Sequence, residues 1–245
     1  MHMRKQLHVK IQHPLCNHMT QRRSYTSPLI PYPFILPPYF CTMVKKTILL
    51  RLALATLIGM PLVAIVVDRF SDTVNLQLAI TGDGKFGEQL VMGSLAGLII
   101  AIGAHLLIAS PLLDAVNTSY ARMLGRFRLS ISEILLISLC AGVGEEMLFR
   151  GAIQPFLGIP ITSILFVAIH GYLNPRDWRL SIYGIAMTAG IAWLGYLADS
   201  RGLLSAIIGH TIIDIYLLMY LQRTANSIPV NHNPDLIDFP EEENE

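Results

Sequence analysis

Long runs of apolar residues, separated by short polar segments, dominate the middle of the chain. A helix needs roughly 20 apolar residues to cross the hydrocarbon core of a bilayer. Six runs have about that length: Thr47–Val67, Gln89–Leu113, Ile131–Phe149, Ala152–His170, Leu180–Ala198 and Leu203–Leu221. None shows the alternating pattern of a membrane-spanning β-strand. The pattern therefore predicts an all-α, polytopic transmembrane helix bundle with about six spanning helices, kinked or broken at Pro61 and at Gly158-Ile159-Pro160.

The composition agrees with a membrane protein. Hydrophobic residues make up 53% of the 245 residues and charged residues only 14%, whereas a soluble domain carries about 25% charged residues. These values exclude an ordinary cytosolic enzyme, a fibrous repeat and a mainly disordered chain. The net charge of +1 gives no argument for a nucleic-acid partner. The three cysteines are widely spaced and odd in number, so they predict neither a disulfide framework nor a cysteine-based metal site.

The two ends of the chain differ from its middle. Residues 1–42 are basic and rich in proline, and we expect a disordered extension there. A start codon assigned too early would explain this extension, since Met43 begins a short basic head before the first apolar run. Residues 43–225 form the predicted transmembrane domain, and residues 226–245 form a predicted acidic, disordered tail. Lys and Arg concentrate in the first segment and in the second and fourth loops, so both termini are predicted to be cytoplasmic, in a protein of the plasma membrane.

The candidates for chemistry are the ionisable residues inside apolar runs, because a charge at bilayer depth costs about 2.5–3.5 kcal/mol. Glu146 and Arg150 are four residues apart, hence on one helical face, and can form an ion pair. Glu145 is rotated about 100° from that pair, which leaves it free to act as a general base. An ion pair that fixes a helix end, beside a solvated second glutamate, explains the segment equally well.

Three histidines lie in the other apolar runs. His170 ends one run, where an interfacial or hydrogen-bonded histidine is the more common case. His210 and Asp214 are four residues apart near the middle of the last run. They are either a functional ionisable pair or a buried hydrogen bond that holds two helices together. His105 is interpreted as a polar contact between helices. With a rise of 1.5 Å per residue, Glu145, His170 and His210 fall within about 6 Å of one another in depth, which predicts one buried cluster.

These residues resemble a known family. The three segments are similar to the ordered motifs of the CPBP family, the CAAX-protease and bacteriocin-processing (Abi-type) intramembrane endopeptidases. The resemblance covers about residues 131–216 and is carried by Glu145-Glu146-xxx-Arg150, Phe166-xxx-His170 and His210-xxx-Asp214. Asp214 departs from the pattern, because the type-II prenyl-protein proteases of the family have Asn at this position. This departure weakens an assignment to prenylated substrates in particular and slightly favours a metal ligand.

The resemblance implies a peptidase site inside the helix bundle. It implies that Glu145 activates the attacking water with help from His170, and that Glu146 and Arg150 organise the site. His210 and Asp214 would line the oxyanion region or bind a metal. A Zn²⁺ ion held by His170, His210 and Asp214 is one possibility, since two histidines and a carboxylate form a plausible catalytic set. The same residues can also activate water without a metal, and the sequence contains no HExxH pair.

Three functions are left open by the sequence. The first is an intramembrane endopeptidase that hydrolyses a peptide bond in a membrane-associated or lipidated protein or peptide. The second is a non-catalytic immunity or scaffold protein of the same fold. The third is a proton-coupled transporter. It is disfavoured because the two halves of the sequence show no internal repeat, whereas many carriers are built from such repeats.

Overall fold

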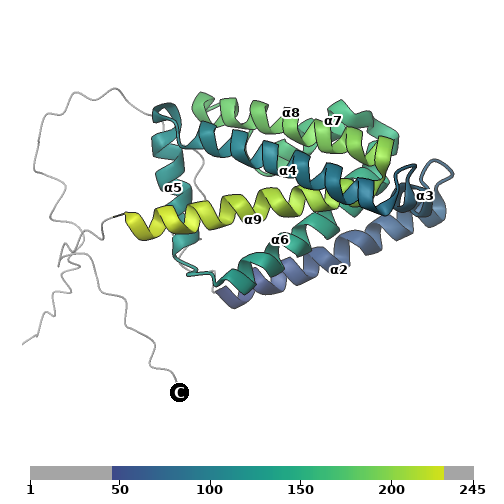
Figure 1. The fold of residues 1–245 in the computed structure, drawn as a ribbon, viewed down its shortest axis with the longest axis horizontal. Coiled ribbons are helices and arrows are strands. Elements are labelled where there is room, and N and C mark those ends of the chain that lie inside the picture. The colour runs from purple at the N-terminus through teal and green to yellow at the C-terminus, as the bar shows by residue number, and fades with distance from the viewer. Residues whose placement is uncertain (1–45, 229–245) are drawn as a thin grey trace, which may run out of the picture. The chain divides into compact units, whose positions relative to one another are not determined.

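The structure is a computed structural model that describes residues 46–228. The predicted extension at 1–42, the predicted chain start at Met43 and residues 229–245 of the predicted tail lie outside the described residues. The described part contains helices and no strand, which confirms the all-α prediction (Figure 1). In chain order the elements are α2 (Lys46–Phe70), α3 (Leu76–Thr81), α4 (Phe86–Ile108), the 3₁₀ turn η1 (Pro111–Leu113), α5 (Asp114–Gly125), α6 (Ile131–Glu146), the π-helical η2 (Met147–Ile153), α7 (Gln154–Ile169), α8 (Trp178–Arg201) and α9 (Leu203–Ser227).

Five helical stretches in this part are long and apolar enough to cross a membrane: α2, α4, the continuous stretch Ile131–Ile169, α8 and α9. The third stretch has 39 residues and covers two of the six predicted runs. The predicted division into the runs Ile131–Phe149 and Ala152–His170 is wrong, because η2 continues the helix there without a proline or a left-handed residue. The chain breaks instead at Gly158, whose φ of 71° is unfavourable for other residues, as the Gly-Ile-Pro sequence predicted.

Two further boundaries differ from the predicted runs. The second run ends at Ile108 rather than at Leu113, because Pro111 begins a separate 3₁₀ turn. The following segment, expected to be a loop, contains the amphipathic helix α5, which buries Val116 and Ala121 while Arg122 stays exposed. Pro61 lies inside α2 without ending the helix.

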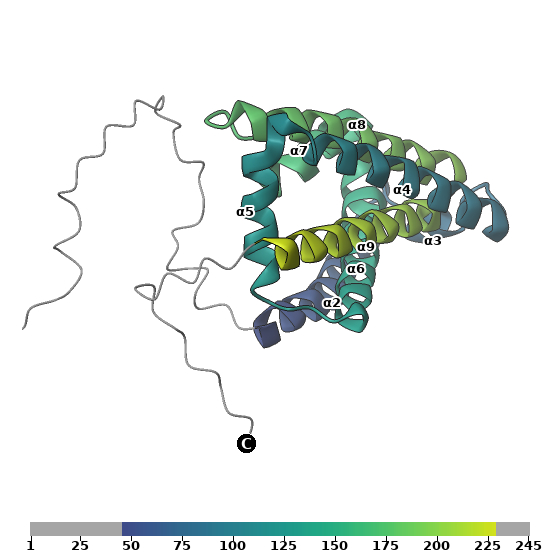
Figure 2. The same cartoon turned by 60° about the vertical axis from the view of Figure 1, so that its left-hand side comes forward.

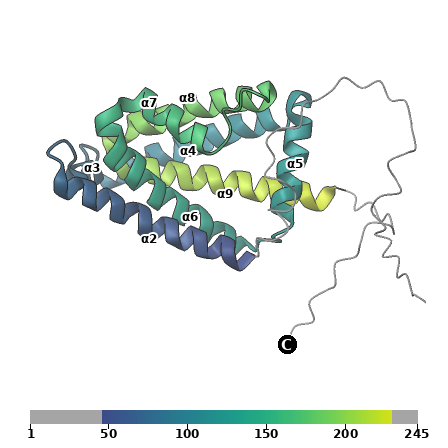
Figure 3. The same ribbon diagram turned by 180° about the vertical axis from the view of Figure 1, so that it is seen from behind.

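Helix α9 occupies the middle of the bundle. It packs against α4, α5, α6 and α8, and Figures 2 and 3 show it between the α2–α6 pair and the α4–α8 pair. Helix α5 lies across the end where α2 begins and α9 ends, and α3 lies at the opposite end (Figure 1). Gly93 and Gly97 of α4 approach the backbone of α9 at Ser205 and Gly209, so this small-residue face packs two helices closely.

The position of α6 is fixed at both of its ends. At its start, the Ser130 side chain accepts from the backbone N–H of Glu133, whose carboxylate accepts from the backbone N–H of Ser130 at 2.7 Å, which forms a capping box. Near its end, Gly142 faces α9 and Gly144 faces α2 so closely that a methyl group on either would meet the neighbouring helix. These contacts set the depth of Glu145, the residue that follows.

Candidate active site

A buried ion pair and a histidine form the centre of the site. Glu146 is completely buried, and its Oε2 lies 3.0 Å from Nε of Arg150. The other carboxylate oxygen, Oε1, accepts a hydrogen bond from Nδ1 of His210 at 2.7 Å. The guanidinium carbon of Arg150 lies 4.6 Å from the ring centroid of Phe166. Glu146 therefore joins α6, η2 and α9, and it fixes the orientation of the His210 ring.

Glu145 is directed away from this pair, as its rotation on α6 predicted. Its Oε2 lies 3.4 Å from Nε2 of His170. The other ring nitrogen of His170, Nδ1, donates to the backbone carbonyl of Phe166 at 2.6 Å, so Nε2 is the nitrogen that is free to exchange a proton with Glu145 or with a water. Both side chains are partly exposed, at 15% for Glu145 and 33% for His170.

A cavity of about 140 Å³, here called the inner cavity, brings four of the predicted polar residues together. Glu145, His170, His210 and Asp214 line it, and its other walls include Phe166, Val167, Tyr172, Tyr183, Met187, Ile191, Ile213 and Leu217. Asp214 Oδ2 lies 3.6 Å from Nε2 of His210. A water occupies about 30 Å³, so the inner cavity has room for a carbonyl group and an attacking water between these carboxylates and imidazoles.

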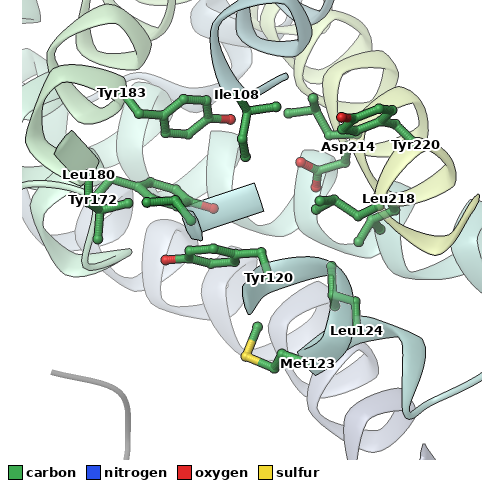
Figure 4. A pocket seen from close by; sticks show the side chains of 13 residues that line it. Ile108, Tyr120, Met123, Leu124, Tyr172, Leu180, Tyr183, Asp214, Leu218 and Tyr220 are labelled. Atoms are coloured by element: carbon green, nitrogen blue, oxygen red, sulfur yellow. The ribbon is translucent and has the colours of Figure 1, made fainter. Parts of the chain in front are cut away.

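A second, larger cavity of about 210 Å³, here called the outer cavity, adjoins the first (Figure 4). Four tyrosines, Tyr120, Tyr172, Tyr183 and Tyr220, line it together with Asp214, Met123 and aliphatic side chains. Burial raises the pKa of Tyr120 and of Tyr172, with smaller contributions from nearby acidic groups, so both hydroxyls stay protonated at neutral pH. The sequence analysis missed these tyrosines, because they come from α5, the α7–α8 loop, α8 and α9 and share no spacing.

The structure gathers all six predicted site residues, but not as a metal-binding group. Among residues 46–228, no three His, Cys, Asp or Glu side chains are arranged to hold an ion. His210 and Asp214 are neighbours, whereas Nε2 of His170 is directed at Glu145. The predicted zinc set of His170, His210 and Asp214 thus does not fit a metal in this arrangement, and zinc stays a prediction for a chelator to test.

His105 lies outside the site and holds two helices together. Its Nδ1 is 2.9 Å from the hydroxyl of Tyr216, and its ring lies 4.2 Å from the ring of Tyr220. Both tyrosines belong to α9. The interpretation of His105 as a polar contact between helices is therefore confirmed.

Part of the chain matches a known protein family. Residues 127–216 match the family model described as Type II CAAX prenyl endopeptidase Rce1-like, and the match includes every predicted site residue. This match confirms the resemblance to the CPBP family over that part of the chain. The uncharacterized protein YpbD of Bacillus subtilis (strain 168) is 37% identical over 87 residues, which are 35% of this chain and 43% of that protein. The chain thus spans less than half the length of this relative, and no solved structure matches it.

Proposed function

We propose, from the match of residues 127–216 to a family of CAAX-type membrane endopeptidases, that this integral membrane protein is an intramembrane endopeptidase. Its substrate would be a membrane-associated or lipidated protein or peptide. The observation that carries the proposal is the pairing of Glu145 with His170 at 3.4 Å on the wall of the inner cavity. A carboxylate and an imidazole that share one small cavity can together take up and return a proton.

In the first step, a water held between Glu145 and His170 attacks the carbonyl carbon of the scissile bond. The water proton passes to the Glu145 carboxylate as the new C–O bond forms, and the carbonyl electron pair moves onto oxygen. The geometry supports this assignment because Glu145 is the carboxylate of the doublet that lines the inner cavity, whereas Glu146 is bound to Arg150 and His210.

The negative charge that develops on the carbonyl oxygen needs a donor. With Nδ1 of His210 donating to Glu146 at 2.7 Å, an imidazolium at His210 would be stabilised and would donate from Nε2 into the inner cavity. The C–N bond then breaks, the carbonyl reforms, and the proton held by Glu145 passes to the leaving amine. Arg150 does not line the cavity and acts by holding Glu146 in place.

The membrane orientation is part of the proposal. The end of the bundle that carries α5 presents the exposed side chains of Arg122, Arg126 and Arg128. An excess of Lys and Arg in short loops marks the cytoplasmic side. We therefore place this end, where α2 begins and α9 ends, on the cytoplasmic side of the plasma membrane.

The test uses the full chain reconstituted into phosphatidylethanolamine–phosphatidylglycerol vesicles with a library of membrane-partitioning peptides. Mass spectrometry identifies new peptide termini. Glu145→Gln is expected to lower the cleavage rate by about 10²–10⁴-fold, the usual contribution of a general base. Glu88 is an exposed glutamate on α4 that does not line the inner cavity, so Glu88→Gln is the matched control and should cleave as the wild type does.

Two outcomes would change the assignment. A Glu145→Gln protein that cleaves at the wild-type rate would contradict the proposed base, and a wild type that cleaves none of the library peptides would favour the non-catalytic immunity or scaffold alternative. Metal chelation is a separate arm of the experiment. Activity that survives 1,10-phenanthroline is expected for the proton-transfer mechanism above, and activity that is lost and then restored by Zn²⁺ would support the zinc prediction.

A further inference from the structure

The outer cavity is continuous in its walls with the inner cavity. Four residues line both: Tyr172, Tyr183, Asp214 and Leu217. A peptide whose scissile bond lies in the inner cavity can therefore place a neighbouring side chain in the outer cavity. That side chain would pass directly beside the Asp214 carboxylate.

Asp214 differs from the other two carboxylates of the site. Glu145 faces His170, and Glu146 is held by Arg150 and His210. Asp214 makes no hydrogen bond to any residue in the described part, and its nearest cationic group there is Nε2 of His210 at 3.6 Å. Figure 4 shows its carboxylate directed into the outer cavity. A carboxylate in an apolar surrounding is stabilised when an opposite charge pairs with it.

The aromatic wall opposite Asp214 also favours a cation. The rings of Tyr120 and Tyr172 are 6.1 Å apart, and those of Tyr172 and Tyr183 are 5.4 Å apart in an edge-to-face arrangement. Aromatic faces grouped in this way attract ammonium and guanidinium groups. The group is held in position, because Gly184 lets the backbone at Tyr172 pack directly on α8, where a methyl group would meet the Tyr172 carbonyl.

Most of the remaining wall is aliphatic, and the wall limits the size of the occupant. Ile108, Val116, Leu180 and Leu221 are among the apolar residues that line it. Its volume of about 210 Å³ is below the roughly 300 Å³ at which pockets for drug-sized ligands begin. The outer cavity therefore suits one long side chain with an apolar stem and a charged end, as in lysine and arginine.

We propose that the outer cavity binds a lysine or arginine side chain of the peptide substrate next to the scissile bond, with Asp214 as its counter-ion and with Tyr120, Tyr172 and Tyr183 around its stem. This inference rests on the proposed function for the identity of the occupant as a peptide side chain. The charge preference itself belongs to the cavity, and it can be measured without catalysis.

The first test measures binding of n-butylguanidinium to the purified full chain by its effect on thermal unfolding. The wild type should bind it, and the neutral analogue n-butylurea should bind at least about tenfold more weakly. Asp214→Asn should weaken n-butylguanidinium binding by about tenfold or more, while the exposed control Asp83→Asn should not. Tyr120→Leu should also weaken it, which keeps the test decisive if Asp214→Asn does not fold.

The second test compares peptides that differ only by Lys, Gln or norleucine beside the cleaved bond. The wild type should cleave the lysine peptide with a kcat/KM at least about tenfold above the other two, and Asp214→Asn should lose this preference whatever its remaining rate. Equal binding of n-butylguanidinium and n-butylurea, or tighter binding of tetramethylammonium than of n-butylguanidinium, would overturn the inference. Cation binding without peptide cleavage would instead contradict only the proposed function.

Discussion

Replacing Arg150 by methionine should destabilise the protein strongly. Arg150 and Glu146 have fully buried side chains, with Nε and Oε2 3.0 Å apart. At an effective dielectric constant of about 20, two unit charges at this separation attract by about 5–6 kcal/mol. Removing one partner leaves a buried charge uncompensated, which costs about 3–5 kcal/mol. For a domain of this size, that loss corresponds to a fall in Tm of about 6–20 °C.

The assay is thermal unfolding of the full chain in detergent, with two comparison variants. The double variant Arg150→Met/Glu146→Leu removes both charges of the pair, so it should be more stable than the single variant. It should stay below the wild type, because Nδ1 of His210 loses its acceptor on Glu146. Arg201→Met removes the partner of Glu88 at 4.0 Å on the exposed surface and should change stability by less than about 1 kcal/mol. A loss below about 1 kcal/mol for Arg150→Met, or a double variant no more stable than the single one, would refute the reasoning.

Three further predictions concern the helices around the site. Gly142→Val places methyl groups against the backbone of α9, so it should lower both Tm and peptide cleavage, and an unchanged cleavage rate would contradict the close packing. His105→Ala removes the hydrogen bond to α9 and should cost about 1 kcal/mol while leaving cleavage within about threefold of the wild type. In a chain without its own cysteines, Thr73→Cys should react with a membrane-impermeant maleimide added to intact cells, whereas Ser119→Cys should react only after lysis; the reverse pattern would contradict the orientation.

Much of the site could be predicted from the sequence because a helix fixes both the direction and the depth of its side chains. The four-residue spacing of Glu146 and Arg150 predicted their ion pair, and the constant rise per residue predicted that Glu145, His170 and His210 share one level. The structure brings them together, with Glu145 and His170 3.4 Å apart. The break at Gly158 was predictable for a similar reason, since the Gly-Ile-Pro sequence interrupts helical hydrogen bonding locally.

Features that depend on how elements meet were not predictable. The sequence paired His210 with Asp214, four residues away, whereas its hydrogen bond goes to Glu146, 64 residues away on another helix. The helix α5 was expected to be a loop because its amphipathic face is buried only when the rest of the bundle is present. The four tyrosines of the outer cavity come from α5, the α7–α8 loop, α8 and α9, and no local pattern links them.

Hydrolysis in H₂¹⁸O decides whether Glu145 activates a water for peptide-bond cleavage. The wild type, reconstituted in vesicles with a peptide that it cleaves, should place one ¹⁸O atom in the new α-carboxylate of the amino-terminal fragment. Glu145→Gln should form this labelled fragment about 10²–10⁴-fold more slowly, and Glu88→Gln should form it at the wild-type rate. Labelled product formed equally fast by Glu145→Gln, or a fragment without ¹⁸O, would contradict the mechanism.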